Sequence, residues 1–217
     1  MKNKLFTFFA ALLIPVALMA QQSSNTQSSG NTMEDATTVG GMSKTEFERI
    51  NKEGAAKVAS ISATKGSLSS ADKELMLEVA KGGMQQLAAS QIAAKRASSA
   101  KIRQLAEAEV EEQTGLAAKL KEIATAKGVT LPTQPDPQTQ AMLTRFEQLS
   151  GEELDRYYMA ESGVKGHEKL DKVMSKVQAQ AKDSNLKSLA AAAHPLVRTH
   201  LQVARTTLDS ISATGNK

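Results

Sequence analysis

The chain has 217 residues with no cysteine, and aromatic residues make up only 3 % of it. Disulfides and a thiol nucleophile are therefore excluded. The abundance of Ala, Leu, Lys, Glu and Gln favours an all-α fold of one domain with tails, because strands draw on β-branched and aromatic residues. The net charge of +4 is spread over 27 basic and 23 acidic residues, without a basic tract or an aromatic platform, which argues against a nucleic-acid partner.

Residues 1–20, MKNKLFTFFAALLIPVALMA, have the parts of a secretory signal peptide: a basic start, an apolar run and a small residue, Ala20, before the expected cleavage. The run is short for a membrane span, which needs about 20 apolar residues, and an uncleaved anchor is the alternative. Gln21 stands where a bacterial lipoprotein would need cysteine. We therefore expect a periplasmic or secreted protein with no stable membrane span after cleavage.

The rest of the chain divides into three predicted regions. Residues 21–43 are rich in Gln, Ser, Asn, Thr and Gly and predict a disordered linker, because they offer almost nothing to bury. Residues 44–66 predict an N-terminal amphipathic helix that ends at Gly66. Residues 67–213 predict a helical bundle.

The bundle is expected to begin with a pair of helices. Ser69 caps a helix over residues 70–97, and a second helix over residues 100–127 ends at Gly128, a natural C-cap. Only Ser98 and Ser99 separate them, which predicts an antiparallel hairpin.

The next segment cannot be one continuous helix, because LPTQPDP places three prolines within six residues. Asp136 and Pro137 have the residue types of the cap and the first position of a short helix that runs to Leu149. Residues 129–149 are therefore expected to carry the chain from one end of the first hairpin back to the other.

A long helix is predicted over residues 150–181, with Ser150 and Glu153 as a capping box. His167 lies within its apolar stripe, whose members recur at helical spacing: Ala160, Val164, Leu170, Met174, Val177 and Ala181.

The last helix is predicted over residues 185–211, with a kink at Pro195. His200 lies on its apolar side, and His194 is expected to face solvent. Two hairpins joined by one long crossover predict a ferritin-like four-helix bundle, preceded by the N-terminal helix. A simple up-down bundle or an extended helical arm would not explain the Pro-rich joint.

Five stretches resemble one family when taken in order: GGMQQLAASQIAAKRAS, KIRQLAEAEVEEQ, GVTLP, GEELDRYYM followed by Gly166–His167, and LKSLAAAAHPLVRTHLQVA. They are similar to the bacterial exported family known as domain of unknown function four-one-four-two. The resemblance covers roughly residues 69–209 and implies a ferritin-like, exported protein of no established activity.

The family pattern is only partly kept at its polar positions. Gln86 stands where the resemblance implies an acidic residue, and Glu112–Gln113 stand where it implies Asp-His. The remaining polar positions agree with the pattern: Asp155, Arg156, Tyr158, His167 and His200.

Two readings of the inward histidines stay open. A di-iron site would need Glu-x-x-His motifs, which the sequence lacks. A single divalent metal ion held by His167, His200 and Glu112 is one hypothesis. The other hypothesis needs no cofactor: both histidines are satisfied by hydrogen bonds inside the bundle, with Gln86 and Gln113 as partners.

Asp155 and Tyr158 complete the predicted set of core polar residues. Asp155 lies in the first turn of its helix, where an acid favours the helix dipole, and Tyr158 is expected to reach the crossover.

The sequence carries none of the motifs Gly-x-Ser-x-Gly, His-Glu-x-x-His or a phosphate-binding glycine loop. We therefore expect a non-catalytic structural or interaction module of the cell envelope. The alternatives are a metal-binding or metal-storage ferritin-like protein, and an amphipathic protein that sits on membrane surfaces. A homo-oligomer is compatible with each of them.

Overall fold

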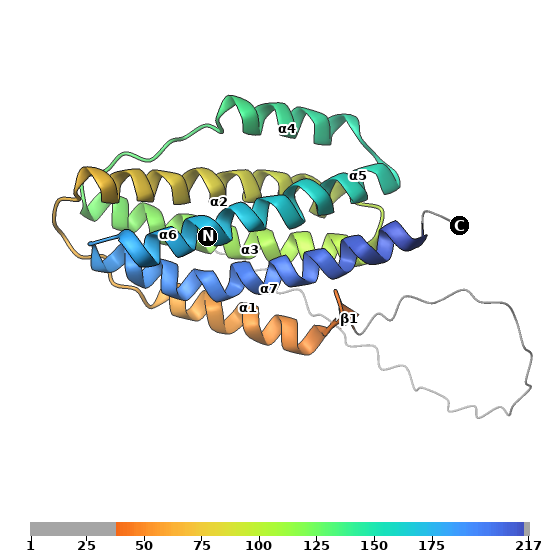
Figure 1. The fold of residues 1–217 in the computed structure, drawn as a ribbon, viewed down its shortest axis with the longest axis horizontal. Coiled ribbons are helices and arrows are strands. Elements are labelled where there is room, and N and C mark those ends of the chain that lie inside the picture. The colour runs from red at the N-terminus through yellow and green to blue at the C-terminus, as the bar shows by residue number, and fades with distance from the viewer. Residues whose placement is uncertain (1–37, 215–217) are drawn as a thin grey trace, which may run out of the picture. The chain divides into compact units, whose positions relative to one another are not determined.

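The computed structural model describes residues 38–214, and within them the chain is almost entirely helical (Figure 1). The expected signal peptide and residues 21–37 of the expected linker lie outside the described residues. The elements are β1 Thr38–Val39, β2 Met42–Ser43, α1 Lys44–Ala59, α2 Ser70–Arg96, α3 Ala100–Ala126, α4 Pro137–Gln148, α5 Gly151–Tyr158, a π-helical segment η1 Met159–Gly166, α6 His167–Gln180 and α7 Ser184–Thr214.

Two long antiparallel hairpins form the main body. Helices α2 and α3 make the first hairpin, and α6 and α7 make the second, with α5 and η1 extending α6 at its N-terminal end (Figure 1). The two hairpins meet where α2 packs against α5, η1 and α6. Residues 127–150 join the hairpins and carry α4 outside the helices they connect (Figure 1).

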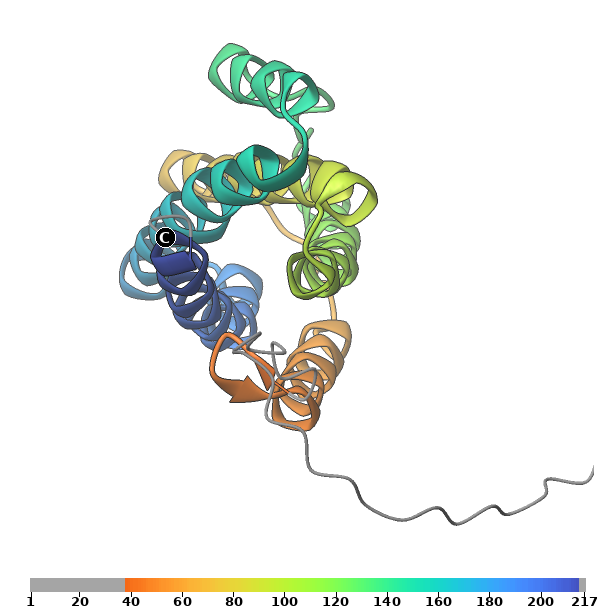
Figure 2. The ribbon, with the colours of Figure 1, turned by 90° about the vertical axis from the view of Figure 1, so that its right-hand side faces the viewer.

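Helix α1 fills the side where the two hairpins are furthest apart. It packs against both α3 and α7, which have few contacts with each other (Figure 2). Phe47 and Val58 of α1 are buried, and Gly54 is pressed so closely onto Leu196 of α7 that a Cβ would lie 2.4 Å from its side chain. The N-terminal helix is therefore an integral part of the packed structure.

The core has two apolar halves separated by polar side chains. One half is aliphatic, with members such as Met76, Ile123 and Leu186. The other half contains the buried aromatic residues, among them Phe146 and Tyr158. On each long helix the polar positions fall between residues of the two halves: Gln86 on α2, Glu109, Glu112 and Gln113 on α3, His167 at the start of α6, and His200 on α7. We call these six residues the polar layer.

The linker was predicted to extend to residue 43, but its last six residues are folded. Thr38 pairs with Ser43 and Val39 with Met42 in a small antiparallel hairpin. Gly40 and Gly41 both have positive φ, and a Cβ on Gly40 would lie 2.4 Å from the Val203 carbonyl oxygen. This tight turn docks the buried Val39 beside α7, which polar composition alone did not reveal.

The N-terminal helix was predicted to run to residue 66, but α1 ends at Ala59. The segment that follows is held away from helical geometry by Asn185. Its amide nitrogen donates to the Ser62 carbonyl oxygen at 2.7 Å, and its amide oxygen accepts from the Thr64 backbone N–H at 2.9 Å. A long-range contact therefore ends the helix.

The capping box predicted at Ser150 and Glu153 is absent. Ser150 makes no side-chain cap hydrogen bond among the described residues, and Gly151, the first residue of α5, takes a positive φ of 56°. The crossover helix does start as the sequence predicts, because the Asp136 side chain accepts from the Thr139 N–H and Pro137 occupies the first turn. No helix between residues 38 and 214 is long and apolar enough to cross a membrane.

Candidate metal centre

A carboxylate and two histidines meet at the middle of the polar layer. Glu109 projects inward from α3, His167 from the first position of α6, and His200 from α7, and all three are buried. Their ligand-type atoms lie within 4.8 Å of one another. His167 Nε2 is 2.6 Å from Glu109 Oε1, and His200 Nδ1 contacts the same oxygen. Three helices thus bring a potential tridentate ligand set to one point.

The outer nitrogen of each histidine is held by an oxygen acceptor. His167 Nδ1 lies 2.8 Å from the Gly163 carbonyl oxygen, and His200 Nε2 lies 2.7 Å from the side-chain oxygen of Asn51 on α1. Both contacts require the outer nitrogen to carry hydrogen. In the neutral form of each ring, the inner nitrogen then presents its lone pair toward Glu109, as in histidines whose second N–H is fixed by a backbone or side-chain acceptor in metal sites.

Two buried carboxylate oxygens complete the polar layer without partners of their own. Glu109 Oε2 and Glu112 Oε2 have no hydrogen-bond partner among the described residues. Glu112 Oε2 lies 3.4 Å from His200 Nε2, a loose contact. A buried carboxylate oxygen without a donor is costly, so these two atoms have unused capacity to accept a proton or a cation.

The electrostatics of the cluster follow from burial and from charge pairing. Burial alone would raise the pKa of Glu109, but the facing charges of His167 and His200 outweigh it and hold that pKa well below its usual range. Burial raises the pKa of Glu112 to about 7. Burial would lower the pKa of His200, but Glu109 and Glu112 raise it to about 9, and Glu109 likewise raises the pKa of His167 against the effect of burial.

This protonation pattern is compatible with exchange of protons for a divalent cation. The raised pKa values of His167 and His200 and the lowered pKa of Glu109 favour an ionised Glu109 between two protonated histidines in the metal-free cluster. If each imidazole loses the proton on its inner nitrogen while one divalent ion enters, the two positive charges of the ion replace those of the two protons. The buried net charge is then unchanged, and the ligands take the deprotonated form that metal binding requires.

The π-helical segment η1 places His167 against α2. Gly166 packs so tightly onto Gln86 that a Cβ would lie 2.5 Å from its amide oxygen. Gln86 donates to the Ser162 carbonyl oxygen at 3.1 Å and accepts from the Ser162 hydroxyl at 2.7 Å, and its amide nitrogen lies 3.0 Å from His167 Nδ1. A π-turn of this kind often marks a functional site, because its wider ring displaces side chains from regular helical positions.

The residues that sequence reasoning singled out separate into two groups. Gln86, His167, His200 and Glu112 meet in the polar layer. Gln113 does not reach a histidine: its amide nitrogen is 3.5 Å from Glu112 Oε1, and its side chain borders an apolar cavity.

Asp155 and Tyr158 lie away from this cluster and fix the fold. The Asp155 carboxylate accepts from the N–H groups of Ser98 and Ser99, each at 2.8 Å, and so holds the turn of the first hairpin. The Tyr158 hydroxyl lies 3.0 Å from the Ser90 hydroxyl on α2, and its ring packs edge-on against Phe146 of the crossover helix.

His194 was predicted to face solvent, but it is largely buried. Its side chain is 11 % exposed, and Nε2 lies 2.8 Å from Asp171 Oδ1 on α6. The sequence around Pro195 does not indicate this contact, because His194 on α7 pairs with a residue of the neighbouring helix α6. His194 is nevertheless outside the polar layer, so it serves as a natural control for the other two histidines.

Sequence reasoning missed Glu109 and Asn51. The periodicity of α3 contained a signal for Glu109, because it follows Leu105 by four residues and precedes Leu116 by seven. A glutamate on that apolar stripe is an inward acid. Asn51 had no comparable signal, since its contact with His200 depends on how α1 docks between the hairpins.

The fold and the site together define an all-α helical domain with a buried carboxylate–histidine cluster. The chain matches the domain of unknown function DUF4142 over residues 57–207 and belongs to that family. This confirms the family resemblance seen in the sequence motifs. No curated protein and no solved structure matches the chain.

Proposed function

We propose that this protein is an exported, ferritin-like helical bundle that binds one divalent transition-metal ion in its polar layer, as a metal-binding rather than a catalytic protein. The inward nitrogens of His167 and His200 and the Glu109 carboxylate would hold the ion, with Glu112 beside them. Two imidazoles and one or two carboxylates suit ions such as Zn²⁺, Fe²⁺ or Mn²⁺. The bound ion would be held as a stored cargo.

The observation that carries this proposal is that both ring nitrogens of His167 and of His200 are held by oxygen atoms. Each outer nitrogen is held by an oxygen that can only accept, while both inner nitrogens converge on one carboxylate. Export is supported by residues 1–20. The ferritin-like assignment is supported by two antiparallel hairpins joined across residues 127–150.

A non-catalytic role is supported by the burial of the cluster. The side chains of His167, Glu109 and His200 are exposed by 3 %, 1 % and 1 %. The apolar cavity described below is bordered by Gln113 but not by these three residues. A substrate would have to displace packed helices to reach them.

The test is titration of the chelator-treated full chain with Zn²⁺ by calorimetry and with Co²⁺ by visible absorption. We expect one ion per chain and a Co²⁺ spectrum with nitrogen and oxygen ligands. His200→Ala and Glu109→Gln should weaken Zn²⁺ binding by at least tenfold. His194→Ala is the matched control and should bind as the unaltered chain does.

Failure to bind either ion, or an equal loss in His194→Ala, would contradict the metal hypothesis. The unaltered chain should also bind Zn²⁺ more tightly at pH 8 than at pH 6, because the ion competes with the protons on both imidazoles.

A second candidate, a structural or interaction module, is favoured by the metal-free hydrogen bonding. Both ring nitrogens of each histidine already have partners within the protein. In that case the polar layer serves to fix the register of α1, α3, α6 and α7. The titration separates the two candidates, because only the first predicts a stoichiometric ion.

A further inference from the structure

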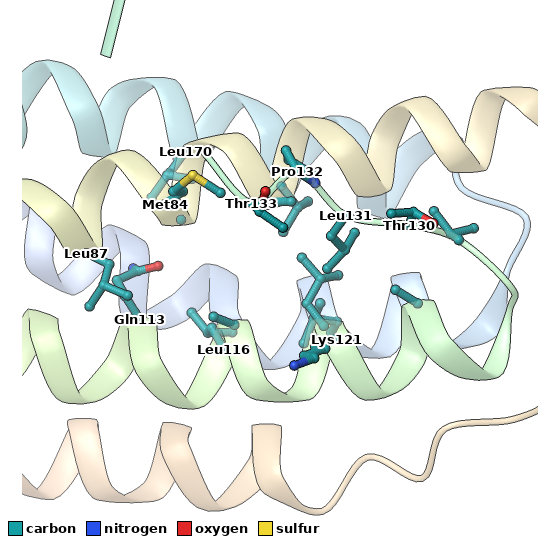
Figure 3. Close-up of a pocket in the computed structure, with 18 of the residues that line it drawn as sticks. Met84, Leu87, Gln113, Leu116, Lys121, Thr130, Leu131, Pro132, Thr133 and Leu170 are labelled. Carbon is teal, nitrogen blue, oxygen red and sulfur yellow. The ribbon is translucent and has the colours of Figure 1, made fainter. Parts of the chain in front are cut away.

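A second feature of the bundle is a cavity between α2, α3 and residues 129–133 of the crossover. Its volume is about 500 Å³, within the range of about 300–1,000 Å³ that is usual for small-molecule sites. In Figure 3, Met84 and Leu87 of α2 lie across from Leu116 of α3, and Leu131 comes from the connecting segment.

The cavity extends from the surface into the aliphatic half of the core. Its deep wall is formed by side chains from the second hairpin, namely Leu170, Met174, Leu189 and Val197. All four are at most 2 % exposed. Apolar walls of this kind hold ordered water poorly, so a hydrocarbon occupant would meet little competition from solvent.

The rim has one charge, and it is positive. Among residues 38–214, Lys121 is the only charged residue that lines the cavity, and no Asp or Glu of this range lines it. Lys121 is exposed and makes no ion pair with any residue between 38 and 214. The hydroxyl-bearing residues Thr130 and Thr133 also line the cavity and can donate hydrogen bonds, whereas the Thr125 hydroxyl donates to the Lys121 carbonyl oxygen at 2.9 Å. This rim complements an anionic head group.

The dimensions favour a single hydrocarbon chain over a helix. From Gln113 to Thr125 the α3 wall spans twelve residues, or about 18 Å at the helical rise. One leaflet of a bilayer, the depth filled by one acyl chain, is about 15 Å. A helix is about 10 Å across with its side chains, much wider than an acyl chain, so a hydrocarbon chain matches a cavity of about 500 Å³ better than a helix from a second copy does.

We propose that this cavity binds one long-chain fatty acid, with the acyl chain between α2 and α3 and the carboxylate at Lys121. The site is separate from the polar layer, and the proposal does not depend on metal binding. Gln113 is the only residue common to the cavity and to the layer.

The experiment is calorimetric titration of the full chain with palmitate below its aggregation concentration, compared with hexadecanol and hexadecyltrimethylammonium. We expect saturable binding of one palmitate per chain and at least tenfold weaker binding of the cationic amphiphile. Ala80→Phe introduces a ring at the α2 wall and should weaken palmitate binding by at least tenfold. Ala118→Phe is the matched control, because Ala118 is exposed on α3 and does not line the cavity.

The contribution of the head group is tested separately. Lys121→Gln should weaken palmitate binding about threefold to fivefold, the upper part of the range of an exposed ion pair, and should leave hexadecanol binding unchanged. Lys73→Gln removes an equal charge from an exposed position of α2 outside the cavity and should change neither. Circular dichroism would check that each variant is folded.

Three outcomes would overturn the proposal. The first is no saturable palmitate binding by the unaltered chain. The second is equal weakening by Ala80→Phe and Ala118→Phe while both remain folded. The third is an oligomer in sedimentation experiments that Ala80→Phe dissociates and palmitate does not, which would assign this face to a second copy of the chain.

Discussion

The polar layer and the apolar cavity are built from the same helices, but the layer buries charged side chains whereas the cavity is lined mainly by apolar ones. On α3, Glu109 and Glu112 belong to the layer, while Leu116 and Leu120, one and two turns further on, line the cavity. Buried charge is costly unless it is paired, so the layer is packed, and Glu109 Oε2 and Glu112 Oε2 are its side-chain oxygens that lack a hydrogen-bond partner among the described residues. An apolar wall has no polar group to satisfy, so the cavity can stay open until a ligand enters. The two regions therefore differ in the side chains on their walls, because both are built from the same helices.

The largest loss of stability is expected from a substitution that disrupts the polar layer. Glu109→Ala leaves two buried histidines facing an empty acceptor position, and loss of one partner of a buried ion pair costs about 3–5 kcal/mol. Urea unfolding in the presence of a chelator measures this loss. Glu107→Ala, at an exposed position of the same helix, should stay within about 0.5 kcal/mol of the unaltered chain. A loss below about 1 kcal/mol for Glu109→Ala would show that the layer is not an electrostatic unit.

The next effect is a pH dependence that the cavity cannot produce. The ionisable groups of the layer are Glu109 and Glu112 of α3, His167 of α6 and His200 of α7. The amide of Gln86 on α2 faces His167, and the amide of Asn51 on α1 contacts His200 from outside the layer.

The direction of this pH dependence follows from the raised pKa values of His200 and Glu112. The pKa of His200 is raised from 6.5 to about 9, so its stabilisation is complete below pH 6.5 and is lost as pH rises toward 9. Glu112, with a pKa raised from 4.5 to about 7, acts in the same direction between those values. The free energy of unfolding of the metal-free protein should therefore fall by a few kcal/mol between pH 6 and pH 9. Urea midpoints that stay level or rise over this range would contradict the assignment.

A smaller loss of stability is expected at the edge of the polar layer, where Gly166 packs against Gln86. Gly166→Ala would place a Cβ 2.5 Å from Gln86 Oε1, and we expect a loss of about 1–3 kcal/mol, as for other overpacked sites. Gly115→Ala is the matched control, because no described atom outside the nearby backbone of α3 lies within 4 Å of its Cβ position, and it should stabilise the helix by about 0.5–1 kcal/mol. Thermal unfolding of the two variants should therefore shift in opposite directions. A stabilised Gly166→Ala would contradict the close packing.

The smallest effect concerns the cavity. Ala80→Leu adds apolar volume to its wall and should raise the free energy of unfolding by about 0.5–1 kcal/mol, as cavity-filling changes commonly do. A wall that collapses in solution would instead respond as a packed core and lose about 1–3 kcal/mol. Urea unfolding without added amphiphile distinguishes the two results, and Ala118→Leu on the exposed face of α3 is the control.

Much of the helical structure was predictable because its signals are local. The serine cap at Ser69, the Ser98–Ser99 break and the Asp136–Pro137 start are all read from a few neighbouring residues. The early end of α1 was not predictable in this way, because Asn185, more than a hundred residues away, determines it.

The same distinction applies to the site. His167 and His200 stood out as polar residues on apolar stripes, and the same reasoning would have found Glu109 on α3. Gln113 was expected to face a histidine but borders the cavity instead. Which of two adjacent residues on one helix reaches a partner depends on the rotation of that helix, and hydrophobic periodicity does not fix rotation to within one residue.

The π-helical segment η1 also explains how Tyr158 before it and His167 after it can both point into the core. Tyr158 and His167 are nine residues apart, which is two and a half turns of a regular α-helix at about 100° per residue. In regular geometry they would point to opposite sides, yet each is 2 % exposed. The wider turns of η1 absorb this phase difference. If residues 159–166 were wound as a regular α-helix without any change in length, every downstream side chain of α6, His167 first, would turn away from its present neighbours.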